Sequence, residues 1–275
     1  MAVCRWLGTS STSWSTGANW STGSAPGASD IAVFSSTNDI VTGTPPATSI
    51  AGLRVTEGFT GTIGTSSSPM NIAATEVVIN CPNGAVYITG ASTTMNVIAC
   101  GGATPGLKLT NSTVSELRVS GVVGSIEFVG TGGPSAVYMF DSPFATLTVP
   151  STASNHQTIV MNSGTVVTEN GVTHGVTVEG GTLTINGDQT VNTITQSAGV
   201  VNYNSSGTLT TATVRGGTFS LAGNPSTAVT ITNCKVHDGT LDERSGMANV
   251  TYTNDIDIKG RGTVLADVGR TVAIS

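Results

Sequence analysis

Short runs in which apolar and polar residues alternate, separated by glycine, recur along most of the chain. The clearest copies are VTVEGGTLTI at 176–185 and ATVRGGTFSL at 212–221, and TITQSAGVVNY at 193–203 fills the interval between them. A further copy, CKVHDGTLDE, follows at 234–243. Alternation over a few residues is typical of half-buried strands. A repeat of about 18–22 residues predicts a solenoid, in which successive copies stack as coils.

Similar units occur earlier in the chain, so the predicted solenoid extends over most of it. They begin at Leu53, Val77, Val97, Leu117, Leu147 and Ile159, and a last unit begins at Ile256. The irregular stretch GTGGPSAVYMFDSP at 130–143 is interpreted as an insertion loop on one coil. Equivalent strands of neighbouring coils would pair in parallel at a spacing of about 4.8 Å. Roughly ten such coils make a rod on the order of 50 Å long.

The sequence therefore predicts an all-β chain folded as a right-handed parallel β-helix, because parallel crossovers are overwhelmingly right-handed. Inward Val, Ile and Leu would form ladders along the axis, and glycine would supply corners with positive φ. Asn, Ser and Thr at equivalent positions would form hydrogen-bonded ladders. A β-sandwich is the alternative, since it also has short strands and frequent turns. The similarity between whole units favours the solenoid.

Composition agrees with a folded β protein. Of the 275 residues, 9% are charged, 38% are hydrophobic and 35 are glycine. Regularly spaced aliphatic residues argue against disorder, and the many Val, Ile and Thr residues suit a pleated surface. We find no window with the apolar spacing and caps of an amphipathic helix.

The N-terminal part differs from the rest, which divides the chain into a capping or docking segment at 1–49 and a coil region at 50–275. All three tryptophans, Trp6, Trp14 and Trp20, lie in the first segment. The open end of a solenoid exposes apolar ladders and unpaired strand edges, so its terminal unit must be an atypical cap. Large indole rings suit that role. Alternatively, Trp6, Trp14, Trp20 and Phe34 dock onto a partner, because Trp is enriched in binding hot spots.

A motif within this segment resembles a known group of proteins. It runs Trp14-x-x-x-x-Asn19-Trp20 and then Pro26-Gly27-x-x-Asp30-x-Ala32-x-Phe34. The motif is similar to the opening of β-helical repeat proteins of autotransporter-like adhesins and of bacteriophage virions. The resemblance implies a protein that serves as a shield, fibre or spike, and it brings no catalytic residue with it.

Sequence signals for export, such as a signal peptide or a membrane span, distinguish adhesins from virion proteins. The opening MAVCRWLGTSSTSW lacks the apolar run of a secretory signal peptide, and no stretch approaches the roughly 20 apolar residues of a membrane span. We therefore expect a virion protein made in the host cytoplasm, with no membrane contact, rather than an exported adhesin.

The four cysteines agree with synthesis in a reducing compartment. Cys4, Cys81, Cys100 and Cys234 show neither CxxC nor Cys/His metal spacing. Cys81 and Cys100 are about one coil apart, so we expect them to stack as neighbours in the interior as small apolar side chains. A disulfide between them is the alternative.

Acidic residues gather near the C-terminus and are the candidates for chemistry. They are Asp238, Asp242 and Glu243, beside His237, and Asp255 and Asp257 nearly one coil later. Paired carboxylates hydrolyse glycans, and clustered carboxylates bind Ca²⁺. Asp238, Asp242, Asp255 and Asp257 are thus weak candidate metal ligands. The favoured interpretation is a solvated acidic face, with Asp255 and Asp257 outside and Ile256 and Ile258 inside.

Other ligands receive little support. His156 and His174 lie in polar turns, and neither GxSxG nor a phosphate-binding glycine loop is present. With a net charge of −6 and ten basic residues spread over the chain, we expect no nucleic acid ligand. Threonine pairs such as Thr182/Thr184 are typical of ice-binding solenoids, but the repeat is too irregular to match a lattice.

The sequence thus predicts a non-enzymatic structural protein of a phage virion, a capsid decoration or fibre-like protein that needs no cofactor. Its partners would be the major capsid protein or other virion proteins, and it could form a homo-oligomer such as a trimer. The alternative is a tail spike or adhesin that binds cell-surface glycan, with or without a hydrolase or lyase activity.

Overall fold

The computed structural model describes residues 1–37, 39–45, 49–101, 105–121, 123–149, 156–169, 172–188, 190–221, 228–244, 250–266 and 274. Apart from one 3-10 turn, η1 (Gly17–Asn19), the regular structure of these residues is β. The chain forms two compact units, Met1–Ala136 with Ser142–Thr148 and Val137–Asp141 with Val149–Ser275. Strand β13 (Gly133–Phe140) is divided between the two.

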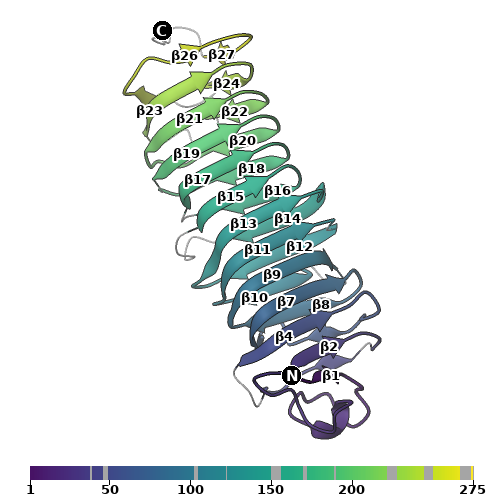
Figure 1. Ribbon diagram of the computed structural model, residues 1–275. Helices are drawn as coiled ribbons and strands as arrows, with labels where there is room; N and C mark the ends of the chain where they lie inside the picture. Colours follow the sequence, from purple (N-terminus) through teal and green to yellow (C-terminus); the bar gives the residue numbers. More distant parts are fainter. Residues whose placement is uncertain are drawn as a thin grey trace. The chain divides into compact units, whose positions relative to one another are not determined.

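The first unit contains two parallel sheets. One has the order β1 (Val3–Arg5), β2 (Ile31–Phe34), β4 (Ser49–Val55), β7 (Ala73–Cys81), β9 (Ala91–Cys100) and β11 (Thr113–Ser120). The other has the order β3 (Ile40–Val41), β5 (Thr62–Ile63), β8 (Ala85–Thr89), β10 (Leu107–Thr110), β12 (Val123–Val129) and β14 (Phe144–Val149), and β6 (Met70–Asn71) also pairs with β8. The chain alternates between the two sheets, so that each coil adds a strand to both, as Figure 1 shows.

The second unit repeats this plan. One sheet has the order β15 (His156–Met161), β17 (Val172–Val178), β19 (Val191–Gln196), β21 (Leu209–Val214), β23 (Val229–Val236) and β25 (Val250–Tyr252), and β26 (Asp257–Ile258) also pairs with β23. The other has the order β16 (Thr165–Thr168), β18 (Thr182–Ile185), β20 (Val200–Tyr203), β22 (Thr218–Ser220), β24 (Thr240–Asp242) and β27 (Thr263–Leu265).

The core of the second unit is a set of inward ladders in strict register. Val176 pairs with Ile194, Ile194 with Ala212, and Ala212 with Cys234, and all four are at most 2% exposed. Burying such columns is favourable because each apolar side chain leaves water and packs on its equivalent one coil away. Strand pairing is parallel throughout the described pairs, so the predicted β-helix is confirmed and a β-sandwich is not favoured.

Glycine forms the corners between the two sheets, as predicted. Gly181, Gly199 and Gly217 occupy equivalent positions with φ of +77°, +73° and +74°. A Cβ atom on Gly199 would lie 2.4 Å from the carbonyl oxygen of Gly181, and one on Gly217 would lie 2.2 Å from that of Gly199. Both the left-handed backbone and the close stacking of successive corners therefore require glycine.

Polar ladders accompany the apolar ones. The Asn186 amide donates to Glu169 Oε1 at 3.0 Å, and the Asn204 amide donates to Asn186 Oδ1 at 3.0 Å. These bonds join three successive coils beside β16, β18 and β20. Another such bond joins Asn254 Nδ2 to Asn233 Oδ1 at 2.7 Å. The predicted side-chain ladders are confirmed at these positions.

The prediction of an insertion loop at 130–143 is wrong. The segment contains β13, in which Val137 and Met139 are buried and Tyr138 and Phe140 face outward. The glycine and proline residues around β13 are typical of loops, and buried and outward residues alternate regularly over only four residues, Val137 to Phe140. At the N-terminal side, β2 pairs with β4, so residues before position 49 share a sheet with the coils that follow.

Candidate functional sites

The tryptophans of the N-terminal segment point into the solenoid interior. Trp6, Trp14, Trp20 and Phe34 are at most 3% exposed. The Trp14 and Trp20 rings lie 4.7 Å apart and the Trp6 and Trp20 rings 5.1 Å apart, both edge to face. Phe34 continues the cluster to Phe59, one coil further on, at 5.6 Å. The aromatic rings thus lie over the first coils, in the position that a capping role requires.

Asn19 holds the loop that carries these rings. Its side chain is fully buried, and its Oδ1 accepts hydrogen bonds from the backbone N–H groups of Ser10 and Ser11 at 2.9 and 3.0 Å. Its Nδ2 donates to Ser11 Oγ at 3.0 Å and to the Ser13 carbonyl at 2.9 Å. A buried amide with all these partners fixes a single loop conformation.

Asp30 ties the N-terminus to the same segment. Its carboxylate accepts hydrogen bonds from the backbone N–H groups of Ala2 at 2.6 Å and Gly27 at 3.0 Å. These two bonds lower the pKa of Asp30 below its ordinary value of 3.8. Asn19, Asp30 and Phe34, which belong to the motif of resemblance, therefore all have structural roles here.

Docking through the four aromatic side chains stays a prediction. Because these four aromatic rings are buried, a partner would contact other atoms of the N-terminal segment. Met1, Val3 and Leu7 are 87%, 50% and 47% exposed, in or next to the terminal strand β1. β1 pairs with β2 on one side and ends the order of its sheet. On its other side the Arg5 carbonyl accepts a hydrogen bond from the Ser21 N–H at 2.9 Å, and the Leu7 N–H donates to the Asn19 carbonyl at 2.7 Å.

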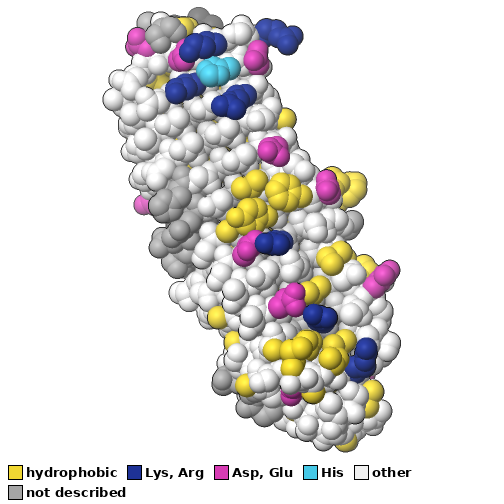
Figure 2. Space-filling model, in the orientation of Figure 1, with side chains coloured by type: hydrophobic (Ala, Val, Ile, Leu, Met, Phe, Trp, Pro, Cys, Tyr) yellow, Lys and Arg dark blue, Asp and Glu magenta, His cyan; other side chains and the backbone are white. Residues whose placement is uncertain are grey.

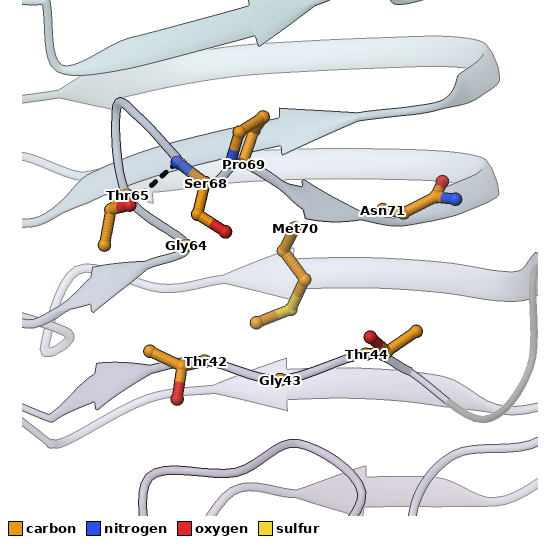
Figure 3. A pocket seen from close by; sticks show the side chains of 9 residues that line it. All are labelled: Thr42, Gly43, Thr44, Gly64, Thr65, Ser68, Pro69, Met70 and Asn71. Atoms are coloured by element: carbon orange, nitrogen blue, oxygen red, sulfur yellow. Dashed lines mark hydrogen bonds between the residues drawn. The ribbon is translucent and has the colours of Figure 1, made fainter.

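A recess of about 230 Å³ lies in the first unit, between 42–44 and 64–71. It forms because β6 pairs with β8, while the chain after β3 turns away at Gly43 and Thr42 bridges to Ser13. Figure 3 shows Met70 pointing into this space and the Thr65–Ser68 turn beside it, closed by a 2.9 Å hydrogen bond. Hydroxyl, amide, thioether and backbone groups line it, and none of its nine lining residues is ionisable.

The structure separates the acidic residues that are close in sequence. Glu243 is 1% exposed and accepts a hydrogen bond from the Tyr252 hydroxyl. Asp242 faces outward and forms two 2.9 Å hydrogen bonds with the Arg244 guanidinium. Among the described residues, no group of three or more His, Cys, Asp or Glu side chains could hold a metal ion. Asp255 is exposed and Ile256 is buried, in agreement with the predicted alternation, although Asp257 and Ile258 are both half-buried.

Cations hold the outer carboxylates in their charged form. A hydrogen bond from Lys259 is the main cause that lowers the pKa of Asp257, and Arg244 lowers the pKa of Asp242 in the same way. Asp257 Oδ2 lies 2.8 Å from Lys259 Nζ and 3.9 Å from His237 Nε2. General acid catalysis needs a carboxyl group whose pKa is raised, and these shifts have the opposite direction.

Basic residues gather around Asp257 in a group that sequence reasoning missed. We call Arg215, Lys235, His237, Lys259 and Arg261 the basic patch. Lys235 pairs in register with Thr213 on one side and Asp257 on the other. Figure 2 shows Lys and Arg side chains around a histidine over the last coils. The signal was present in the sequence, because these residues recur at intervals of about one coil.

The predicted stacking of two cysteines is confirmed. Cys81 pairs in register with Cys100, and both are buried free thiols. Burial raises the pKa of each to about 12. Cys4 and Cys234 are also buried and free. The side chains of His156 and His174 lie outside the described part of the chain.

Comparisons of the chain with protein-family models, with curated proteins and with solved structures found no match. A search of the described residues for a helix long and apolar enough to cross a membrane found none.

Proposed function

We propose that the chain is a structural, non-catalytic component of a phage virion, a capsid decoration or fibre-like protein that coats or extends the particle. The observation that carries this proposal is the parallel register that stacks buried columns from one coil to the next within each unit, with single shifts at Ile79/Asn80 and at His156/Thr158. Each coil is bonded to its neighbours along both sheets, so local opening would break many backbone hydrogen bonds together. Such a fold suits a protein that must resist force and proteases.

The aromatic cap supports the same role. Terminal units that cover the apolar interior are needed for a solenoid to stay soluble. Here the indoles are turned inward, while Val3 in β1 and Leu7 after it remain exposed. Exposed apolar side chains at the end of the N-terminal segment are a surface on which another protein can pack. The proposed contact with a major capsid protein or another virion protein is at this surface.

The arrangement of the acids favours this role over glycan cleavage. A retaining or inverting glycosidase needs two carboxyl groups that face each other across the scissile bond. Glu243 is inside the solenoid, and Asp242 and Asp257 are each hydrogen-bonded to a cation. Asp242 and Asp257 therefore fit structural ion pairs better than a catalytic pair.

The test is mass spectrometry of purified particles from the phage whose genome encodes the chain. We expect the protein in particles at a fixed ratio to the capsid protein. A variant with Val3→Glu and Leu7→Glu should lose particle association while its thermal unfolding midpoint stays within a few degrees of wild type. A matched variant, Ile98→Glu, changes an exposed apolar residue in β9 and should remain bound. Absence of the wild-type chain from particles would refute the proposal.

A further inference from the structure

We propose that the basic patch binds a linear glycan that carries sulfate or phosphate groups. The inference goes beyond the structural role and does not depend on it. The patch lies within the second unit, on the outer side of β23 and β26 and at the corners that follow β21 and β23.

The patch is built on two adjacent columns of the solenoid. Backbone hydrogen bonds place Arg215, His237 and Lys259 directly after the registered residues Val214, Val236 and Ile258. They therefore lie one above another on successive coils. Because coils are about 4.8 Å apart, Arg215 and Lys259 are separated by about 10 Å along the axis. A chain of anionic groups that runs along the axis would meet one cation after another.

The second column brings a further cation and a carboxylate. It contains Thr195, Thr213, Lys235 and Asp257 in register. Lys235 and Lys259 are exposed, and the Lys259 ammonium is held 2.8 Å from Asp257. That ion pair orients Lys259 but also neutralises part of its charge.

Charge sets this surface apart from the rest of the molecule. Four of the ten Lys and Arg residues are in the patch, on a chain whose net charge is −6. Two carboxylates, Asp257 and Asp238, lie among them, and Asp238 Oδ1 accepts a hydrogen bond from the Arg261 backbone N–H at 3.1 Å. With His237 neutral, the patch still carries an excess of two positive charges. A locally positive field on an acidic protein attracts anionic ligands.

The neighbouring groups favour a glycan over a nucleic acid. Thr195 and Thr213 continue the same sheet face and offer hydroxyl groups to sugar hydroxyls. Neither column contains Trp, Tyr or Phe, whereas single-stranded nucleic acids are held largely by stacking on aromatic rings. Proteins that bind duplex DNA make about 6–10 phosphate contacts. The patch supplies fewer contacts, because it has four cations with two carboxylates among them.

The experiment measures binding of the full chain to immobilised dextran sulfate, with uncharged dextran as the reference surface. We expect dissociation constants that rise with salt, because the contacts are exposed and screened. The triple variant Lys235→Gln, Lys259→Gln, Arg261→Gln should bind about tenfold more weakly. The matched control Arg54→Gln, Lys108→Gln, Arg118→Gln removes the same charge from the first unit, and its affinity should fall less than about threefold.

One variant should bind more tightly. Asp257→Asn removes a carboxylate from the patch and releases Lys259, so we expect affinity for dextran sulfate to rise about threefold. Misfolding cannot produce a gain of this kind. Equal losses in the two triple variants, or no binding by wild type at low salt, would overturn the proposal. Tighter binding to single-stranded DNA than to dextran sulfate would replace the glycan by a nucleic acid and would likewise overturn it.

Discussion

The indole N–H of Trp20 donates a 2.7 Å hydrogen bond to the backbone carbonyl of Trp14, inside the N-terminal cap. Both rings are at most 1% exposed. The N–H of Trp14 is equally buried, and no described residue accepts a hydrogen bond from it. Two tryptophans that touch each other thus differ at their polar atom: the N–H of Trp20 has an acceptor and the N–H of Trp14 has none in the described part of the chain.

This difference predicts unequal costs for the same substitution. Trp20→Phe removes a buried hydrogen bond, whereas Trp14→Phe removes an unsatisfied donor, and both lose similar apolar volume. We expect Trp20→Phe to lower the free energy of unfolding by about 1 kcal/mol more than Trp14→Phe. Urea unfolding followed by circular dichroism measures both. Equal losses would show that ring packing alone determines the stability of the cap.

Corner glycines give a second prediction. Gly199→Ala places a Cβ atom 2.4 Å from the Gly181 carbonyl oxygen at a position with φ of +73°, so we expect it to cost more than about 2 kcal/mol of unfolding free energy.

Gly175→Ala is the matched control in the same unit. Its Cβ atom meets no atom within 4 Å. In a strand, alanine restricts the unfolded chain more than glycine does, so Gly175→Ala should be neutral or slightly stabilising. Thermal unfolding of the two variants beside wild type measures the contrast. A Gly199→Ala protein as stable as Gly175→Ala would mean that the corner relaxes without cost.

Register was predictable because the copies that include Val176, Ile194 and Ala212 carry apolar residues and a corner glycine at equivalent positions. Val201 and Tyr203 lie beside Leu183 and Ile185 because a shift by one residue would turn every apolar side chain outward. Where a coil departs from the repeat, as in β13, the pattern failed to predict the strand. Short alternation between glycines leaves strand and loop equally compatible with the sequence.

Site chemistry was less predictable than the fold. The acids were expected to form a solvated face, with Asp257 on the outside. Glu243 instead turns inward, because side-chain direction depends on register across coils rather than on closeness in sequence. The basic patch was missed for the same reason. Lys235 and Lys259 are far apart along the chain and come together only when one coil stacks on the next.

Thiol chemistry provides a third prediction. Burial raises the pKa of Cys81, Cys100 and Cys234 to about 12, from an ordinary value of 9.0. The native thiols should therefore remain unlabelled by iodoacetamide at pH 8 and react fully in urea, because only the thiolate is nucleophilic.

The same shifts predict loss of stability at alkaline pH. Between about pH 9 and 12 the unfolded chain releases thiol protons that the folded chain retains, so the free energy of unfolding falls as pH rises. Replacing Cys81 and Cys100 with alanine should lower stability at pH 7 but make its decline above pH 9 less steep. Labelling of the native protein at the rate of a free peptide thiol would contradict both expectations.

Acid should loosen the N-terminal cap through Asp30. Its folded pKa is lowered by the N–H groups of Ala2 and Gly27, so the stability it contributes is present above the ordinary value of 3.8 and is lost as pH falls through the folded pKa. We expect Asp30→Asn to unfold at lower urea than wild type at pH 6, and we expect this difference to shrink as pH falls below 3.8. The other carboxyl groups titrate in both proteins. The difference in stability between wild type and Asp30→Asn therefore reports the contribution of Asp30 alone. The protection of the Ala2 amide against hydrogen exchange, relative to an unfolded peptide at the same pH, should fall over the same range. A difference in urea midpoint between the two proteins that stays constant from pH 6 to pH 3 would show that the Asp30 carboxylate does not hold the N-terminus.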